Sequence, residues 1–148
     1  MVMHSKNPEE TKGVAKNIWA QLDSSPTIIA LEGELGAGKT VFVKGLINDE
    51  VTSPSFVLHI PYKIGDKTLH HIDAWRLEKF EELERLGLVD MLVPNSVVVI
   101  EWADKFKSQI TSLKSHAKII WIKIGYGENK TERRVEYIYE NLGNRNQL

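Results

Sequence analysis

The eight residues Gly33–Thr40 (GELGAGKT) carry the strongest chemical signal in this sequence, because they match the phosphate-binding pattern G-x-x-x-x-G-K-[ST] without a mismatch. The glycines let the chain curl tightly, so that backbone N–H groups converge on an anion. A helix that begins near Lys39 would add the positive end of its dipole beneath the phosphates. We expect Lys39 to reach the β- and γ-phosphates and the Thr40 hydroxyl to bind Mg²⁺.

Two acidic residues could complete such a site, which needs a carboxylate for the metal or its water shell. Glu101 directly follows the apolar run Val97–Ile100, and Asp73 ends the run Leu69–Ile72. Because the carboxyl ends of parallel strands share one edge of a sheet, where ligands bind, we expect Glu101 to meet the loop there. If the strand before Asp73 also ends at that edge, Asp73 could hold a metal-bound water or orient the attacking one. The spacing leaves open which acid positions the attacking water, and Asp73 could equally cap the turn that follows it.

A hydroxyl-rich segment, Thr52–Ser55 (TSPS), separates the expected phosphate-loop helix from the next strand. Pro54 favours an extended conformation at Ser53. Such a loop could become ordered around a γ-phosphate, as the loops of P-loop switch proteins do, but an ordinary turn fits the sequence equally well.

Hydrophobic periodicity predicts the elements that must position these residues. Apolar residues at helical spacing predict helices over 8–22, 39–48 and 78–86, and β-branched or apolar runs predict strands over 27–32, 55–62, 67–73, 96–101 and 118–125. Strands 55–62 and 67–73 should form a hairpin with Gly65 in its turn. The stretch 131–148 fits either a helix or a strand, and its β-branched and aromatic content favours a strand. The order predicts an α/β fold: a P-loop NTPase-like three-layer domain with a mixed, mainly parallel central sheet and an antiparallel hairpin.

Length and composition narrow the function classes. A chain of 148 residues, 42% hydrophobic and 26% charged, fits one globular domain over 1–148. No run approaches the roughly 18–20 apolar residues that cross a bilayer. The absence of cysteine excludes thiolate catalysis and cysteine zinc sites, and agrees with a cytoplasmic protein. Nineteen basic against twenty acidic residues argue against strong binding to nucleic acid by this chain alone.

Several segments together resemble the bacterial TsaE (YjeE) family of P-loop ATPases of the tRNA threonylcarbamoyladenosine pathway. They keep the order of the family, from about Pro8 to Gly125. The segments are Gly33–Thr40, Val51–Phe56, His71–Asp73 followed by Arg76-Leu77, Glu81–Leu83 with Leu86–Leu88, and Val99–Trp102.

This resemblance implies roles for individual residues. Thr40 and Glu101 would hold Mg²⁺, and Thr11 matches an N-terminal threonine near the nucleotide. The expected catalytic residues are Lys39, Asp73 and Glu101. The residues expected to bind ATP are Thr11, Gly33, Glu34, Leu35, Gly36, Ala37, Gly38, Lys39, Thr40 and Val41.

The resemblance also implies partners, namely a threonylcarbamoyl-transferase subunit of the TsaD type and its companion of the TsaB type. ATP hydrolysis would reset that complex between turnovers, tRNA would be contacted only through the complex, and no membrane would be involved. No arginine stands in a clear finger context, so we expect slow hydrolysis alone and faster hydrolysis with partners. Three alternatives remain: a small-molecule kinase, a nucleotide-gated adaptor without significant hydrolysis, and a GTPase, since Asn129–Glu132 is a near miss to the guanine-reading pattern N-K-x-D.

Overall fold

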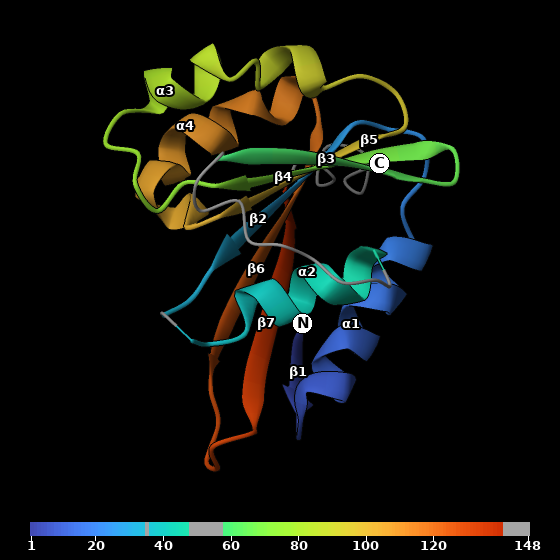
Figure 1. The fold of residues 1–148 in the computed structure, drawn as a ribbon, viewed down its shortest axis with the longest axis vertical. Helices are drawn as coiled ribbons and strands as arrows, with labels where there is room; N and C mark the ends of the chain where they lie inside the picture. Colours follow the sequence, from blue (N-terminus) through green and yellow to red (C-terminus); the bar gives the residue numbers. More distant parts are fainter. Residues whose placement is uncertain (35, 48–57, 141–148) are drawn as a thin grey trace, which may run out of the picture.

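A seven-stranded sheet in the order β1-β7-β6-β2-β5-β4-β3 forms the middle of the molecule (Figure 1). The computed structural model describes residues 1–34, 36–47 and 58–140. The strands are β1 (Val2–Ser5), β2 (Thr27–Glu32), β3 (His59–Ile64), β4 (Lys67–Asp73), β5 (Ser96–Glu101), β6 (Lys118–Tyr126) and β7 (Arg133–Glu140). The four central strands are parallel, while β1, β7 and β3 pair antiparallel with their neighbours. The predicted α/β fold with a mixed sheet is confirmed, and its parallel part is the centre.

Helices cover both faces of this sheet, which gives three layers (Figure 1). One face carries α1 (Pro8–Ala20) and α2 (Lys39–Ile47). The other face carries α3 (Phe80–Arg85) and α4 (Lys107–Thr111), with the short 3₁₀ turns η1 (Val89–Met91), η2 (Ala103–Phe106) and η3 (Ser112–Ser115).

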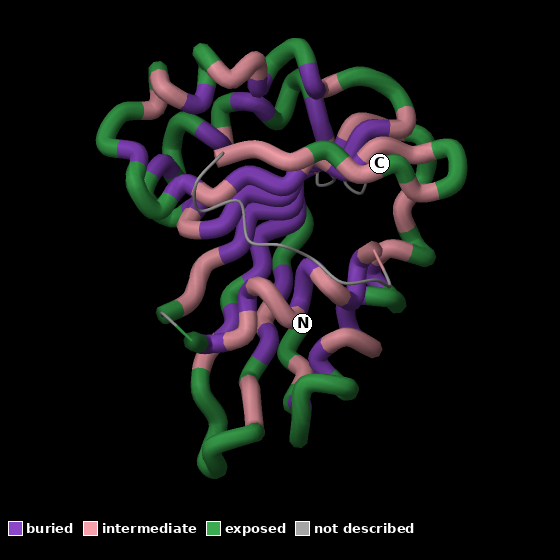
Figure 2. Tube along the Cα trace, in the orientation of Figure 1, coloured by how far each residue is buried: buried purple, intermediate pink, exposed green. Residues whose placement is uncertain are grey.

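The alternation of side chains along the central strands divides the core into two clusters. In β2, Ile29 and Leu31 pack with the α1 and α2 residues, whereas Ile28 and Ala30 pack with those of the opposite layer. Every residue of β5 is buried, because both faces of a parallel centre are covered (Figure 2). The central strands are thereby packed on both faces, and their carboxyl ends lie side by side at one edge of the sheet.

Several element boundaries differ from the predictions for local reasons. The helix expected over 8–22 ends at Ala20, since the amides of Gln21 and Leu22 bond to carbonyls three residues back. The helix expected from Glu78 begins at Phe80, because the Glu82 side chain accepts bonds from the amides of Glu78 and Lys79.

At the edges of the sheet, β3 runs from His59 to Ile64, so the hairpin turn contracts to Gly65-Asp66, with Gly65 at φ 60°. The start predicted for this strand, at Ser55, lies outside the described residues. The strand prediction near the C-terminus is confirmed over Arg133–Glu140. The edge strand β1, which pairs with β7, was not predicted.

Candidate functional site

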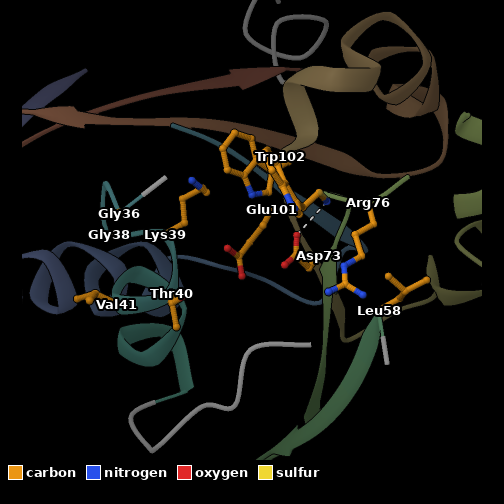
Figure 3. A pocket seen from close by; sticks show the side chains of 11 residues that line it. Gly36, Gly38, Lys39, Thr40, Val41, Leu58, Asp73, Arg76, Glu101 and Trp102 are labelled. Carbon is orange, nitrogen blue, oxygen red and sulfur yellow. Dashed lines mark hydrogen bonds between the residues drawn. The ribbon is translucent and has the colours of Figure 1, made fainter. Parts of the chain in front are cut away.

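A cavity of about 480 Å³ opens at the carboxyl edge of the parallel strands (Figure 3). It lies where the loop after β2 meets the ends of β4 and β5, because Asp73 and Glu101 are register partners and Leu31 pairs with Glu101 on the other side. The lining residues are Gly36, Gly38, Lys39, Thr40, Val41, Leu58, Asp73, Trp75, Arg76, Glu101 and Trp102. The predicted meeting of the phosphate loop with Glu101 at one edge therefore occurs, and the strand that ends in Asp73 finishes at the same edge.

The phosphate loop has the predicted strand–loop–helix context. Gly38 has φ 109°, a conformation that favours glycine. A Cβ on Gly33 would lie 2.4 Å from the carbonyl oxygen of Ile124, so this position also excludes a side chain. The amide of Phe42 donates to the Gly38 carbonyl at 2.9 Å and starts α2 directly after the loop.

The Lys39 side chain is folded back against its own loop. Its Nζ donates to the carbonyls of Gly33 (2.6 Å) and Glu34 (2.9 Å), and lies 4.0 Å from the ring centroid of Trp102. Burial lowers the pKa of Lys39, and the carboxylates of Glu101, Asp104 and Asp73 oppose that change. The ammonium therefore lies among acceptors that a phosphate oxygen could replace.

Trp102 adopts the left-handed conformation (φ 62°, ψ 34°) immediately after β5. Such a backbone is rare for a bulky residue and costs on the order of 1–3 kcal/mol, so the surroundings must enforce it. The Trp102 ring packs against Trp75, with ring centroids 4.5 Å apart and planes tilted by 46°. Trp102 and Trp75 both line the cavity beside Lys39.

Glu101 is a buried carboxylate with a dedicated partner. Its Oε2 lies 2.6 Å from Nε2 of His71, which is fully buried in β4. Since an ionised carboxylate only accepts, the hydrogen lies on Nε2. The Nδ1 atom of His71 has no hydrogen-bond partner among the described residues. The contact fixes the orientation of Glu101 from the neighbouring strand.

Asp73 has a different environment at the end of β4. Its Oδ1 accepts a 2.9 Å bond from the backbone N–H of Trp75, so the turn-capping role does exist. Burial raises the pKa of Asp73, and repulsion from Glu101 adds to this, although the bond from Trp75 partly offsets it. Asp73 lines the cavity as well, so capping and a role in chemistry are compatible.

The donor set around the cavity fits a magnesium ion. Thr40 offers a hydroxyl from the first turn of α2, and Glu101 and Asp73 extend carboxylates into the same space (Figure 3). Magnesium prefers oxygen ligands and is typically held by one or two carboxylates together with waters and phosphates. Among the described parts of the chain, no group of three or more His, Cys, Asp or Glu residues could hold a metal by itself. The residues thus suit an ion whose shell is completed by a nucleotide.

The other predicted site residues lie at varying distances from this cavity. Gly33 and Glu34 line an adjoining pocket, and Ala37 is fully buried within the loop. Thr11 is buried in α1, where its hydroxyl is 2.5 Å from that of Ser5, and it does not line the cavity. Leu35 and Thr52–Ser55 lie outside the described residues.

The segment Asn129–Glu132, which partly matches the guanine-binding pattern N-K-x-D, does not line the cavity either. Asn129 and Glu132 hydrogen-bond to each other in the connection between β6 and β7, and neither lines the cavity. Two contacts at the site were not predicted from the sequence: that of His71 with Glu101 and that of Arg133 with the phosphate loop. Only the pairing of β4 with β5, and of β7 with β6, brings these residues to the site.

Comparison with known proteins agrees with this architecture. The family model described as "Threonylcarbamoyl adenosine biosynthesis protein TsaE" matches residues 5–135. The chain is 39% identical over 109 residues to the tRNA threonylcarbamoyladenosine biosynthesis protein TsaE of Bacillus subtilis, covering 70% of this chain and 67% of that protein. It is also 39% identical over 111 residues to the protein of the same name from Rickettsia felis, covering 71% and 64%.

The fold comparison extends over nearly the whole chain. The crystal structure of YdiB from Bacillus subtilis matches with a TM-score of 0.70 and 28% identity, covering 99% of this chain and 88% of that one. Within the described residues, no helix is long and apolar enough to cross a membrane. The chain belongs to the TsaE family of threonylcarbamoyl adenosine biosynthesis proteins.

Proposed function

We propose that this chain binds ATP with Mg²⁺ and hydrolyses it in support of tRNA threonylcarbamoyladenosine modification. The observation that carries the proposal is the convergence of the Gly33–Thr40 loop with Glu101 and Asp73 on one cavity. Its relatives from Bacillus subtilis and Rickettsia felis are named as proteins of tRNA threonylcarbamoyladenosine biosynthesis. The alternative of a GTPase lacks support. The segment that would read guanine, Asn129–Glu132, does not line the cavity.

The residues divide the chemistry among them. The loop amides and Lys39 would bind the phosphates and stabilise the charge that develops during transfer of the γ-phosphoryl group. Thr40 and Glu101 would hold Mg²⁺, which as a Lewis acid neutralises charge on the phosphate oxygens. Asp73, which lies beside Glu101 and has a raised pKa, would orient the attacking water.

We further propose that ATP hydrolysis serves a larger assembly in the cytoplasm. The partners would be a threonylcarbamoyl-transferase of the TsaD type and its TsaB-type companion, and tRNA would be contacted through them. The nearly balanced charge of the chain, 19 basic and 20 acidic residues, fits a subunit that leaves RNA contact to its partners.

Single-turnover ATP hydrolysis, measured for the chain alone and then with the transferase pair, tests this function. We expect slow hydrolysis alone and a clear increase with the partners. The Lys39→Ala control should weaken triphosphate binding by roughly 1.5–3 kcal/mol, because a charge-assisted contact is lost. Turnover of tens per second by the isolated chain would contradict the need for partners.

A nucleotide-gated adaptor is distinguished by the variant Glu101→Ala. An ATPase should keep binding ATP in this variant and lose turnover. An adaptor would show little turnover in the parent protein and would respond to nucleotide by a change in partner affinity alone. Equilibrium binding of the partner with ATP, with ADP and without nucleotide therefore separates the two functions.

A further inference from the structure

Arg133, the first residue of β7, contacts the phosphate loop from the far end of the chain. Its Nε donates to the Ala37 carbonyl at 2.8 Å, and its Nη2 lies 3.4 Å from the Gly36 carbonyl. Its Nη1 donates to the carbonyls of Lys130 (2.7 Å) and Glu132 (2.8 Å) in the β6–β7 connection. One guanidinium thus joins two loops that are about a hundred residues apart in sequence.

Tyr126 at the end of β6 supports this guanidinium. The central carbon of the Arg133 group lies 4.8 Å from the Tyr126 ring centroid, and the two residues are register partners of β6 and β7. The ring also borders the loop, since a Cβ on Gly36 would lie 3.1 Å from the Tyr126 hydroxyl. The planar cation is therefore held in one orientation by a ring and by four carbonyls.

The contact has a direct consequence for the phosphate-binding amides. In a trans peptide the C=O and the N–H of the next residue point in opposite directions. Because Arg133 holds the Ala37 carbonyl, the N–H of Gly38 must point away from Arg133. Gly38 lines the cavity, and Arg133 does not. The guanidinium thus orients a loop amide from behind.

We propose that Arg133 is a positioning residue that holds the Gly33–Thr40 loop in its phosphate-binding shape before any nucleotide arrives. The effect on nucleotide affinity rests on the function proposed above, whereas the effect on the loop itself does not. Arg133 acts through the fork geometry of its guanidinium and contacts the carbonyls of the loop, so it is distinct from an arginine that touches the transferring phosphate.

Hydrogen exchange of the nucleotide-free chain tests the positioning of the loop. Arg133→Gln removes the charge and the fork, and Arg133→Lys keeps the charge but cannot make the same set of bonds. The matched control is Arg134→Gln, because Arg134 is the next residue on the strand and pairs with Glu136 instead. We expect amides of residues 33–40 to exchange several-fold faster in both Arg133 variants and at the parent rate in the control.

Binding and kinetics add a second readout. With a fluorescent ATP analogue and Mg²⁺, the dissociation constant should rise roughly tenfold or more in both Arg133 variants. KM should rise with it, and kcat should fall by a smaller factor than KM rises, since Arg133 contacts the loop and not the transferring phosphate. Far-ultraviolet circular dichroism and thermal unfolding check that each variant is folded.

The outcomes separate this inference from the proposed function. If the amides of residues 33–40 exchanged at the parent rate in Arg133→Gln, the inference that Arg133 positions the loop would be wrong. It would also be wrong if Arg133→Lys had the exchange rates and the affinity of the parent chain, because charge alone would then be sufficient. If the parent chain did not bind ATP, the proposed function would fail, while the exchange measurement would still decide whether Arg133 orders the loop.

Discussion

The ends of β4 and β5 carry the same chemical group in two different environments. Glu101 ends β5, is 4% exposed and is bound by a buried histidine. Asp73 ends β4 beside it, is only partly buried and accepts one backbone bond from the turn that follows. The two Cα positions are register partners, so the difference arises from their surroundings and not from their place in the sheet.

This difference in burial and hydrogen bonding favours different roles for the two acids. The contact with His71 holds Glu101 in one orientation, as a metal ligand requires. Asp73 has more freedom, and burial and repulsion from Glu101 raise its pKa, which favours exchange of protons and of hydrogen bonds with water. We therefore expect Glu101 to be the metal ligand and Asp73 to orient the attacking water.

The largest effect is expected for Glu101→Ala. Turnover should fall by about a hundredfold to a thousandfold, because a charge that organises the transferring group is lost. The free energy of unfolding should fall by about 1–3 kcal/mol, since the buried N–H of His71 loses its acceptor. Denaturant unfolding and single-turnover hydrolysis measure the two effects.

Glu101→Gln is the matched control for this variant. Its side-chain carbonyl can still accept the His71 bond, so most of the stability should return while turnover stays low. If the two variants were equally unstable, the buried pair would not be the source of the stability that Glu101 contributes.

Asp73→Asn should lower turnover by about a hundredfold, the contribution typical of a group that handles a proton or a water. In contrast to Glu101→Ala, stability should change little, because the asparagine carbonyl can keep the bond from Trp75. A loss of stability as large as that of Glu101→Ala would remove the proposed difference between the two strand ends.

His71→Ala should reduce turnover by about tenfold, because the residue acts on Glu101 and not on the nucleotide. The distinguishing readout is the Mg²⁺ dependence of hydrolysis. The metal concentration for half-maximal rate should increase, and excess Mg²⁺ should restore part of the rate. No shift in this dependence would argue that His71 is merely a packed core residue.

The smallest effect is a pH dependence of stability in the nucleotide-free, metal-free chain. Since the pKa of Asp73 is raised by folding, the folded state keeps a proton that the unfolded chain loses from about pH 4 upward. The associated stability is present below that pH and is lost as the pH rises through the folded pKa. The free energy of unfolding of Asp73→Asn, relative to the parent chain, should therefore increase between about pH 3 and pH 7.

The sequence predicted those parts of the site that depend on local pattern. Gly33–Thr40 is one contiguous motif, and the position of Glu101 at the end of a buried strand follows from its place after four apolar residues. Its meeting with the loop followed from the rule that parallel strands end at one edge. The hairpin and the C-terminal strand had sufficient β-branched content to be identified.

The remaining features depend on pairings that a sequence does not display. The His71 contact needs β4 to lie beside β5 in a particular register, and Arg133 reaches Ala37 only because β7 turns back along β6. The segment Val2–Ser5 is too short and too polar for its sequence to predict a strand. It forms the strand β1 because it pairs with β7. The folded-back Lys39 contacts the ring of Trp102, whose left-handed backbone has no sequence signature.

The most direct test of the whole account is a crystal structure of this chain with a non-hydrolysable ATP analogue and Mn²⁺, located by its anomalous scattering. We expect the triphosphate to lie in the Gly33–Thr40 loop, Lys39 to leave its carbonyls and bind the phosphates, and the ion to be ligated by Thr40 and Glu101. An ion bound elsewhere, with Glu101 contacting only His71, would contradict it.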